Sequence, residues 1–142
     1  MKAELALSLA LAFAGCAPRG GPPPIAVGTA CAGCGMRIED LSYACETEQQ
    51  GEVRAYDSIE CLLRAGPPAG RAWLADYDTR ALHAADSLWV IQAEIPSPMG
   101  GGYAAFVDRA AAAEIAAARG GRVARLAEFA TGAAADSQEV QP

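Results

Sequence analysis

The stretch LSYACETEQQGEVRAYDSIECLLRAG, residues 41–66, carries the pattern that decides the fold. Apolar and polar residues alternate from Leu41 to Thr47, and a period of two residues is typical of a half-buried β-strand. A Gln-Gln-Gly sequence follows as a turn and leads into a second short strand, Glu52 to Tyr56. The stretch therefore predicts a β-hairpin as the first part of the fold.

A short helix is expected directly after this hairpin. Asp57 or Ser58 offers a side chain that can cap the first turn, and Gly66 with the prolines behind it ends the helix. A third strand is expected from about Arg71 to Tyr77. This part of the chain therefore predicts a ββαβ unit.

The same order of elements is expected a second time further along the chain. Asp108 can cap an alanine-rich helix that ends before Gly120-Gly121, with strands on both sides. The strands predicted for this second unit are 88–95, 102–107 and 122–126. The whole pattern predicts an α+β fold of two ββαβ units, with antiparallel sheet and helices packed on it.

The N-terminal residues have the order of a lipoprotein signal peptide. A positive charge is followed by a short apolar run, and small residues directly precede Cys16. We expect residues 1–15 to be the signal peptide, Cys16 to be lipidated, and the proline-rich segment 16–24 to be a flexible tether. The folded metal-binding domain is expected at 25–130, and a disordered tail at 131–142.

The composition argues against two classes of function. The chain has 142 residues and a net charge of −6, without a cluster of Lys or Arg, so nucleic acid is not an expected partner. No Ser-His-acid constellation or phosphate-binding loop is recognisable. The single histidine, His83, is expected in a loop or at a strand edge, where a lone imidazole is usually solvated. We therefore expect a protein that is not an enzyme.

The segment Cys31-Ala-Gly-Cys34-Gly-Met36 brings three sulfur atoms into six residues. Two thiols around a small turn can converge on one centre, and Met36 reaches the same side if the stretch is extended. Soft thiolate and thioether ligands favour Cu(I), whereas zinc sites do not use a thioether. The alternative is a disulfide between Cys31 and Cys34, which an oxidising compartment would favour.

A second unusual segment is the loop PSPMGGG, residues 96–102. Its prolines and glycines predict an irregular loop that exposes Met99 between two strands, where the thioether is a candidate third ligand. The alternative is that Met99 fills a gap in the core.

Three further side chains have an ordinary structural interpretation beside a functional one. Cys45 lies on the apolar side of its strand and is expected to be a small buried hydrophobe. Asp57 is first of all a helix cap, with a role as ligand or as a neighbour of the ligands as the alternative. Cys61 either faces the metal site or packs in the core, and the residues alone leave both open.

Several motifs occur along the chain in a fixed order. They are Cys31-x-x-Cys34-Gly35-Met36-x-Ile38, Tyr56-Asp57-x-Ile59-x-Cys61, Asp76-Tyr77-x-Thr79, Pro98-Met99-Gly100-x-Gly102-x-x-Ala105-Phe106 and Gly120-Gly121-x-Val123. In this order they resemble NosL, a family of copper-binding lipoproteins that serve the assembly of nitrous oxide reductase. The resemblance extends from about Cys16 to about Phe129.

The resemblance implies a particular set of Cu(I) ligands. They would be Cys34 and Met36 from the first motif and Met99 from the Pro-Met-Gly loop, with Cys31 as a fourth. The chain departs from the family at two positions, since Ser58 stands where a second acid is usual and Glu60 replaces a usual glycine. No role that depends on a second acid is therefore transferred.

The function expected from the residues and the resemblance is that of a copper chaperone. The protein would be lipid-anchored in the cell envelope, facing the periplasm or the cell exterior, and would pass Cu(I) from a donor protein to a recipient. The resemblance implies that the partners are a membrane transporter complex and nitrous oxide reductase. Two alternatives remain at this point, a thiol-disulfide redox protein that uses Cys31 and Cys34, and a structural module stapled by disulfides.

Overall fold

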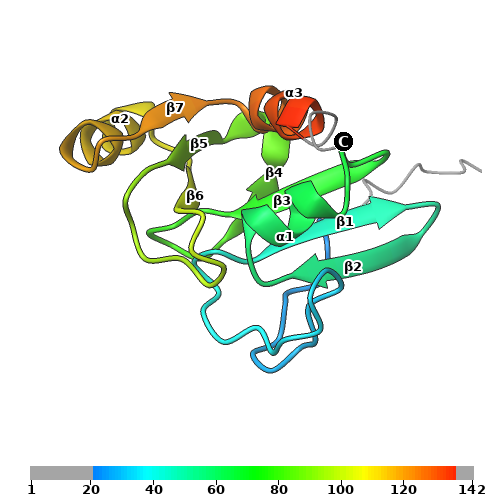
Figure 1. The fold of residues 1–142 in the computed structure, drawn as a ribbon. Coiled ribbons are helices and arrows are strands. Elements are labelled where there is room, and N and C mark those ends of the chain that lie inside the picture. Colours follow the sequence, from blue (N-terminus) through cyan, green and yellow to red (C-terminus); the bar gives the residue numbers. More distant parts are fainter. Residues whose placement is uncertain (1–20, 137–142) are drawn as a thin grey trace, which may run out of the picture.

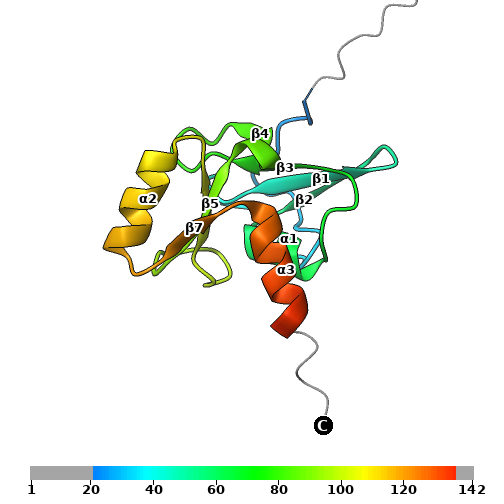
Figure 2. The ribbon, with the colours of Figure 1, turned by 90° about the horizontal axis from the view of Figure 1, so that it is seen from above.

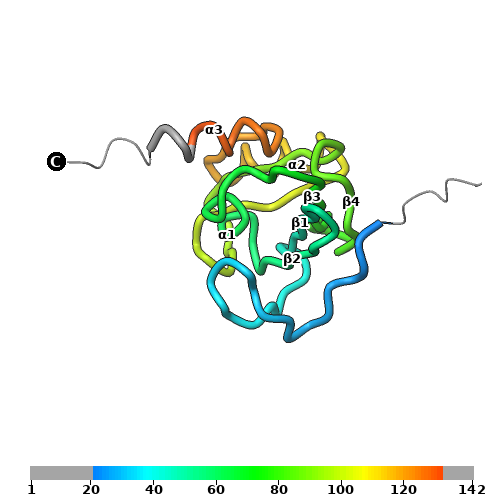
Figure 3. Tube along the Cα trace, turned by 90° about the vertical axis from the view of Figure 1, so that its right-hand side faces the viewer, coloured from blue at the N-terminus to red at the C-terminus, as the bar shows by residue number. Residues whose placement is uncertain are grey.

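The computed structural model describes residues 21–136 of the chain. The expected signal peptide, the expected lipidation site Cys16 and the first part of the expected tether lie outside these residues, as do residues 137–142. Figure 3 shows that the two ends of the described chain leave the domain on opposite sides.

The first half of the domain is the predicted ββαβ unit with one additional strand. Its elements are β1 (Cys45–Gln49), β2 (Glu52–Tyr56), α1 (Ile59–Arg64), β3 (Arg71–Ala75) and β4 (Leu82–Ala84). They form an antiparallel sheet in the order β2-β1-β3-β4, shown in Figure 1. Cys45 pairs with Tyr56 on one side and with Leu74 on the other, so β1 is central in the sheet.

The strand predicted from Leu41 begins four residues later than expected. The chain first forms a turn, in which Ala44 N–H donates to the Leu41 carbonyl and Ser42 N–H donates to Asp40 Oδ1. Ser42, Tyr43 and Ala44 are nevertheless buried, because the turn packs under the sheets. The alternation therefore predicted neither the start of the strand nor its burial, since Ser42, Ala44 and Glu46 on the side expected to be polar are buried as well.

The second half repeats the order of elements on a smaller scale. Its elements are a 3-10 turn, η1 (Ala85–Ser87), then β5 (Trp89–Gln92), β6 (Tyr103–Phe106), α2 (Arg109–Ala118) and β7 (Arg122–Ala124). The strand order is β6-β5-β7, and α2 covers this sheet on its outer side, as Figure 2 shows. Asp108 caps α2 as predicted, because its Oδ1 accepts from Ala110 N–H at 2.7 Å. The α+β fold of two ββαβ units is confirmed.

The C-terminal segment differs from the prediction. A third helix, α3, runs over Leu126–Asp136, although disorder was expected from Thr131 on. The sequence TGAAAD continues the helix because alanine has the highest helix propensity, and Phe129 anchors its first turns with 2% of its surface exposed. Among the described residues, no helix is long and apolar enough to cross a membrane.

The two halves are joined at the end of β3. Asp76 bridges to Ala105 of β6 in parallel, and Tyr77 N–H donates to the Ala105 carbonyl at 2.8 Å. The Asp76 carboxylate accepts from Val107 N–H at 3.0 Å and from the Thr79 hydroxyl at 2.7 Å. The Asp-Tyr-x-Thr motif therefore ties the first sheet to the second.

Buried side chains form two core clusters. The smaller one lies under α2 and contains Phe106 and Ile91. The larger one lies between the four-stranded sheet, α1 and α3, and it includes Ile38, Cys31 and Cys61. The two cysteines therefore belong to the edge of the main core, so their positions are set by packing.

Candidate metal site

The segment before β1 folds into a hairpin, residues 28–38, which we call the thiol hairpin. Gly28 N–H donates to the Ile38 carbonyl and Ile38 N–H to the Thr29 carbonyl, both at 2.8 Å. At the tip, Cys31 N–H donates to the Met36 carbonyl at 2.8 Å. The Ile38 side chain is fully buried and fastens the hairpin to the main core. The tip therefore presents Cys31 and Cys34 from one tight turn.

The tip of the thiol hairpin packs directly against α1. Ala32 N–H donates to the Ala55 carbonyl of β2 at 2.8 Å. A Cβ atom at Gly33 would lie 3.1 Å from the Cys61 Cβ, tighter than nine in ten real contacts of this kind. A residue without a side chain thus lets the hairpin approach Cys61 closely.

Ser58, and not Asp57, caps α1. The Ser58 hydroxyl accepts from Cys61 N–H at 3.3 Å, in an extended cap residue. The expectation that Asp57 is first of all a helix cap is therefore wrong. Because Ser58 takes the cap position, the Asp57 carboxylate is available for other contacts. That carboxylate is buried and faces the thiol hairpin.

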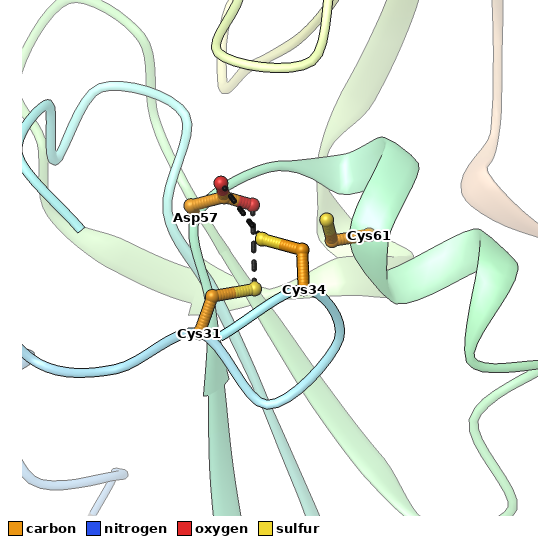
Figure 4. A group of neighbouring side chains, drawn as sticks. All are labelled: Cys31, Cys34, Asp57 and Cys61. Carbon is orange, nitrogen blue, oxygen red and sulfur yellow. Dashed lines mark hydrogen bonds between the residues drawn. The ribbon is translucent and has the colours of Figure 1, made fainter. Parts of the chain in front are cut away.

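Four side chains converge at this point, as Figure 4 shows. One ligand atom each from Cys31, Cys34, Asp57 and Cys61 lies within 4.8 Å of all the others. The Cys31 thiol donates to Asp57 Oδ1 at 3.4 Å, and the Cys34 thiol donates to Asp57 Oδ2 at 3.5 Å. Two sulfurs bound at about 2.3 Å to one ion can be at most about 4.6 Å apart, so small side-chain movements suffice to close the set on a metal.

Only one of the four residues is open to solvent. Cys31, Asp57 and Cys61 are each at most 3% exposed, whereas Cys34 is exposed at the surface. The group is therefore a site at the surface of the core that can be reached past Cys34.

The surroundings hold two of the thiols in their protonated form. Burial raises the pKa of the Cys61 thiol, and hydrogen bonds with Asp57 and Cys34 raise it further. For Cys34, the backbone of Met36 lowers the pKa, but burial together with Cys31 and the charge of Asp57 outweighs it, so the net shift is upward. An ion bound by these thiols therefore has to displace their protons.

The donor set fits a thiophilic ion. Three thiolates suit Cu(I), which accepts low-coordinate sulfur sites, and the addition of a carboxylate would complete a tetrahedral set for Zn(II). No hydroxyl, amide or imidazole takes part, so the hard cations Mg²⁺ and Ca²⁺ do not fit.

The two predicted methionine ligands lie in different surroundings. Met36, at the hairpin tip beside Cys34, is 55% exposed. Met99 is half-buried and packs against the main core cluster, which contains Cys31 and Cys61, and is thus less exposed than expected from its loop. For both residues the role as a ligand stays a prediction.

Burial and position show which of the remaining candidate residues lie in the thiol site. Cys45 is fully buried, and its thiol donates to the Ser58 carbonyl at 3.3 Å, so it belongs to the core as expected. His83 lies half-buried on β4, paired with Leu74, and is not part of the thiol group. Cys61, which the sequence left open, joins the site.

A cavity lies elsewhere in the part of the chain that the structure describes. It has a volume of about 910 Å³, is lined by Trp73, Pro67, Leu126 and neighbouring residues, and contains none of the four metal-site residues. The thiol group is therefore separate from this cavity.

The structure defines a small α+β domain with three thiols and a carboxylate placed so that they could hold a metal ion. Residues 69–133 match the model of the NosL family. The crystal structure of the copper chaperone NosL from Shewanella denitrificans superposes with a TM-score of 0.58 at 19% identity, covering 73% of this chain and 94% of that chain. No curated protein sequence matches the chain.

These findings confirm the resemblance to NosL that the motifs indicate. The structural likeness, at its low identity, shows a shared fold. The family match includes Met99 and the Asp76 motif but begins after Cys31, Cys34, Asp57 and Cys61. The assignment of the thiol site therefore depends on the geometry of this chain.

Proposed function

We propose that this protein is a Cu(I) chaperone that carries the ion on Cys31, Cys34 and Cys61. The observation that carries the proposal is the convergence of three thiols from two separate segments, within 4.8 Å and with one of them exposed. The fold it shares with a copper chaperone supports the same function.

The arrangement suits transfer of the ion more than permanent storage. A partner sulfur can reach the ion past the exposed Cys34, and the thioether of Met36 stands next to it on the same hairpin tip. Ligand exchange requires such access, because the incoming ligand must bind before the first one leaves. Asp57 is a hard oxygen donor, and its role toward Cu(I) is to accept hydrogen bonds and orient the thiols.

The partners and the location are part of the proposal and rest on the sequence. Recipients would be a membrane transporter complex and, through it, nitrous oxide reductase. Lipidation of Cys16 would hold the domain at a membrane facing the periplasm or the cell exterior. Replacement of Cys16 by serine should release the protein from the membrane fraction. Loss of the protein in a host that makes nitrous oxide reductase should lower the copper content of that enzyme.

The redox alternative is disfavoured by the setting of the thiols. Reactive CxxC cysteines usually sit at a helix N-terminus that lowers the pKa of one thiol. Here Cys31 and Cys34 lie in a hairpin turn, and the pKa of Cys34 is raised. The four cysteines that the structure describes are all free thiols, so no disulfide links this part of the chain.

The deciding experiment is a titration of the reduced protein with Cu(I) and, separately, with Zn(II), each against chelators of known affinity. Tight one-to-one binding of Cu(I) with weaker binding of Zn(II) is expected. A protein without metal affinity whose Cys31–Cys34 disulfide cycles readily would be a redox protein, and the proposal would fall.

A further inference from the structure

The loop that carries Met99 is fastened to α1 by one carboxylate. Glu60, with 5% of its surface exposed, accepts from the Ser97 hydroxyl at 2.7 Å and from Gly101 N–H at 2.8 Å, both through Oε1. Met99 lies between these two contact points in the sequence. The loop is therefore closed around the Glu60 side chain.

The loop is built to hold this contact. The Ser97 hydroxyl also accepts from Gly102 N–H at 3.0 Å, and the Tyr43 hydroxyl donates to the Pro96 carbonyl. A Cβ atom at Gly101 would lie 2.6 Å from Glu60 Cγ, a distance that real Cβ atoms essentially never show. Glycine at this position thus permits the carboxylate to reach the loop backbone.

The same carboxylate is costly to bury. Its second oxygen, Oε2, is buried without a hydrogen-bond partner among the described residues. A buried carboxylate oxygen without a hydrogen-bond partner lowers the stability of the fold. Glu60 directly precedes Cys61 on α1, so its contact links the helix of a metal-site thiol to the loop of a candidate thioether ligand.

We propose that Glu60 is a positioning residue that holds the Met99 thioether at the thiol site. Met99 packs, half-buried, against the core cluster that contains Cys31 and Cys61, and the Glu60 anchor keeps it there. This inference rests on the proposed function, since it assigns to Met99 a place in the Cu(I) site.

The first test needs no copper. The ¹³C-methyl NMR signal of Met99 is recorded in the metal-free wild type, in Glu60→Ala, in Glu60→Gln and in Glu114→Ala, the last being an exposed glutamate on α2. Glu60→Ala should move the signal toward that of a solvated methionine. Glu60→Gln should not, because its Oε1 can accept the same two hydrogen bonds, and Glu114→Ala should match the wild type. An unmoved signal in Glu60→Ala would overturn the inference.

The second test measures Cu(I) affinity and the number of sulfur ligands by X-ray absorption. Glu60→Ala should bind Cu(I) about 10- to 100-fold more weakly, as is typical when a residue that orients a ligand is lost. One sulfur ligand should disappear, and Met99→Leu should cause no further loss in this variant. Glu60→Gln should restore both readouts. Equal losses from Met99→Leu in the wild type and in Glu60→Ala would show that the two residues act independently and would overturn the inference.

Failure of the inference differs from failure of the proposed function. A wild type that binds Cu(I) tightly, with Glu60→Ala equal to it, disproves the anchor and leaves the chaperone proposal intact. A wild type without Cu(I) affinity disproves the chaperone proposal in the first titration. If Glu60→Ala does not fold, Ser97→Ala removes one of the two contacts and is measured in its place.

Discussion

Asp57 Oδ1 accepts a hydrogen bond from the thiol of Cys31 across 3.4 Å, although 26 residues separate the two in the sequence. The contact joins the thiol hairpin to the start of α1 and places a hard oxygen donor among soft sulfur donors. How much a bound ion uses this oxygen depends on which ion it is.

Asp57→Asn therefore separates the two candidate ions. We expect Zn(II) affinity to fall by more than about 100-fold, because the carboxylate is needed as the fourth ligand of a tetrahedral site. Cu(I) affinity should fall by only about tenfold, through loss of thiol orientation. Competition titrations measure both, with Asp86→Asn as a control on the surface. Equal losses for the two ions would mean that Asp57 ligates, or fails to ligate, both of them.

An exposed thiol and a buried thiol can be compared by the same substitution. Cys34→Ser should weaken Cu(I) binding by more than about tenfold, since it removes a ligand, whereas Cys45→Ser should leave the affinity unchanged. Cys45→Ser should instead lower the melting temperature, because a hydroxyl replaces a thiol that is 0% exposed. If the two variants lose the same affinity, the assignment of Cys45 to the core is wrong.

The methionines can be tested by substitution with leucine, which conserves volume. Met99→Leu should change the free energy of unfolding by less than about 1.5 kcal/mol and still weaken Cu(I) binding. Met36→Leu, at an exposed position, should leave stability unchanged and slow the transfer of Cu(I) to an acceptor more than it weakens binding. Unchanged affinity in Met99→Leu would remove that residue from the site.

The contact between the two halves predicts a dependence of stability on pH. Burial raises the pKa of Asp76, but hydrogen bonds from Val107 N–H and from the Thr79 hydroxyl and N–H outweigh it, so the net shift is downward. A carboxyl with a lowered pKa in the folded state stabilises the fold above its ordinary pKa, and this contribution is lost as the pH falls through the lowered value.

Asp76→Asn should accordingly lower the free energy of unfolding by about 2 kcal/mol at neutral pH, and by less in acid. Urea unfolding of the wild type and the variant at several pH values between neutrality and pH 3 measures the difference. Asp78→Asn, at an exposed neighbouring position, is the matched control. A difference that does not shrink toward acid pH would contradict this account of Asp76.

The order of strands and helices could be predicted because it depends on local signals. Alternation, the caps and the glycine-proline turns placed β2, α1 and α2 nearly at their observed bounds. Two elements were missed for physical reasons. The strand β4 has only three residues and no period, and the alanine-rich end of α3 lacks the apolar repeat that marks a helix.

The site could be predicted only in part, because half of it depends on tertiary contacts. Cys31 and Cys34 are close in sequence, so their convergence was visible. The place of Cys61 depends on the rotation of a six-residue helix, which is too short to define a face. Whether the Asp57 carboxylate reaches the thiols depended on whether Asp57 or Ser58 is the N-cap residue of α1. The serine three residues before Cys61 was the only local signal, and it was ambiguous.

The thiol hairpin and α1 contribute their sulfur atoms from two separate segments, and the hairpin is a strand of neither sheet. Opening of residues 28–38 would carry Cys31 and Cys34 outward as a pair and leave Cys61 behind in the core. A bound ion would then pass from three sulfurs to two without leaving the protein. A docking partner that pulls on the hairpin could thereby loosen its hold on the ion by one ligand at the moment of contact, and the protein would release its cargo only where it is received.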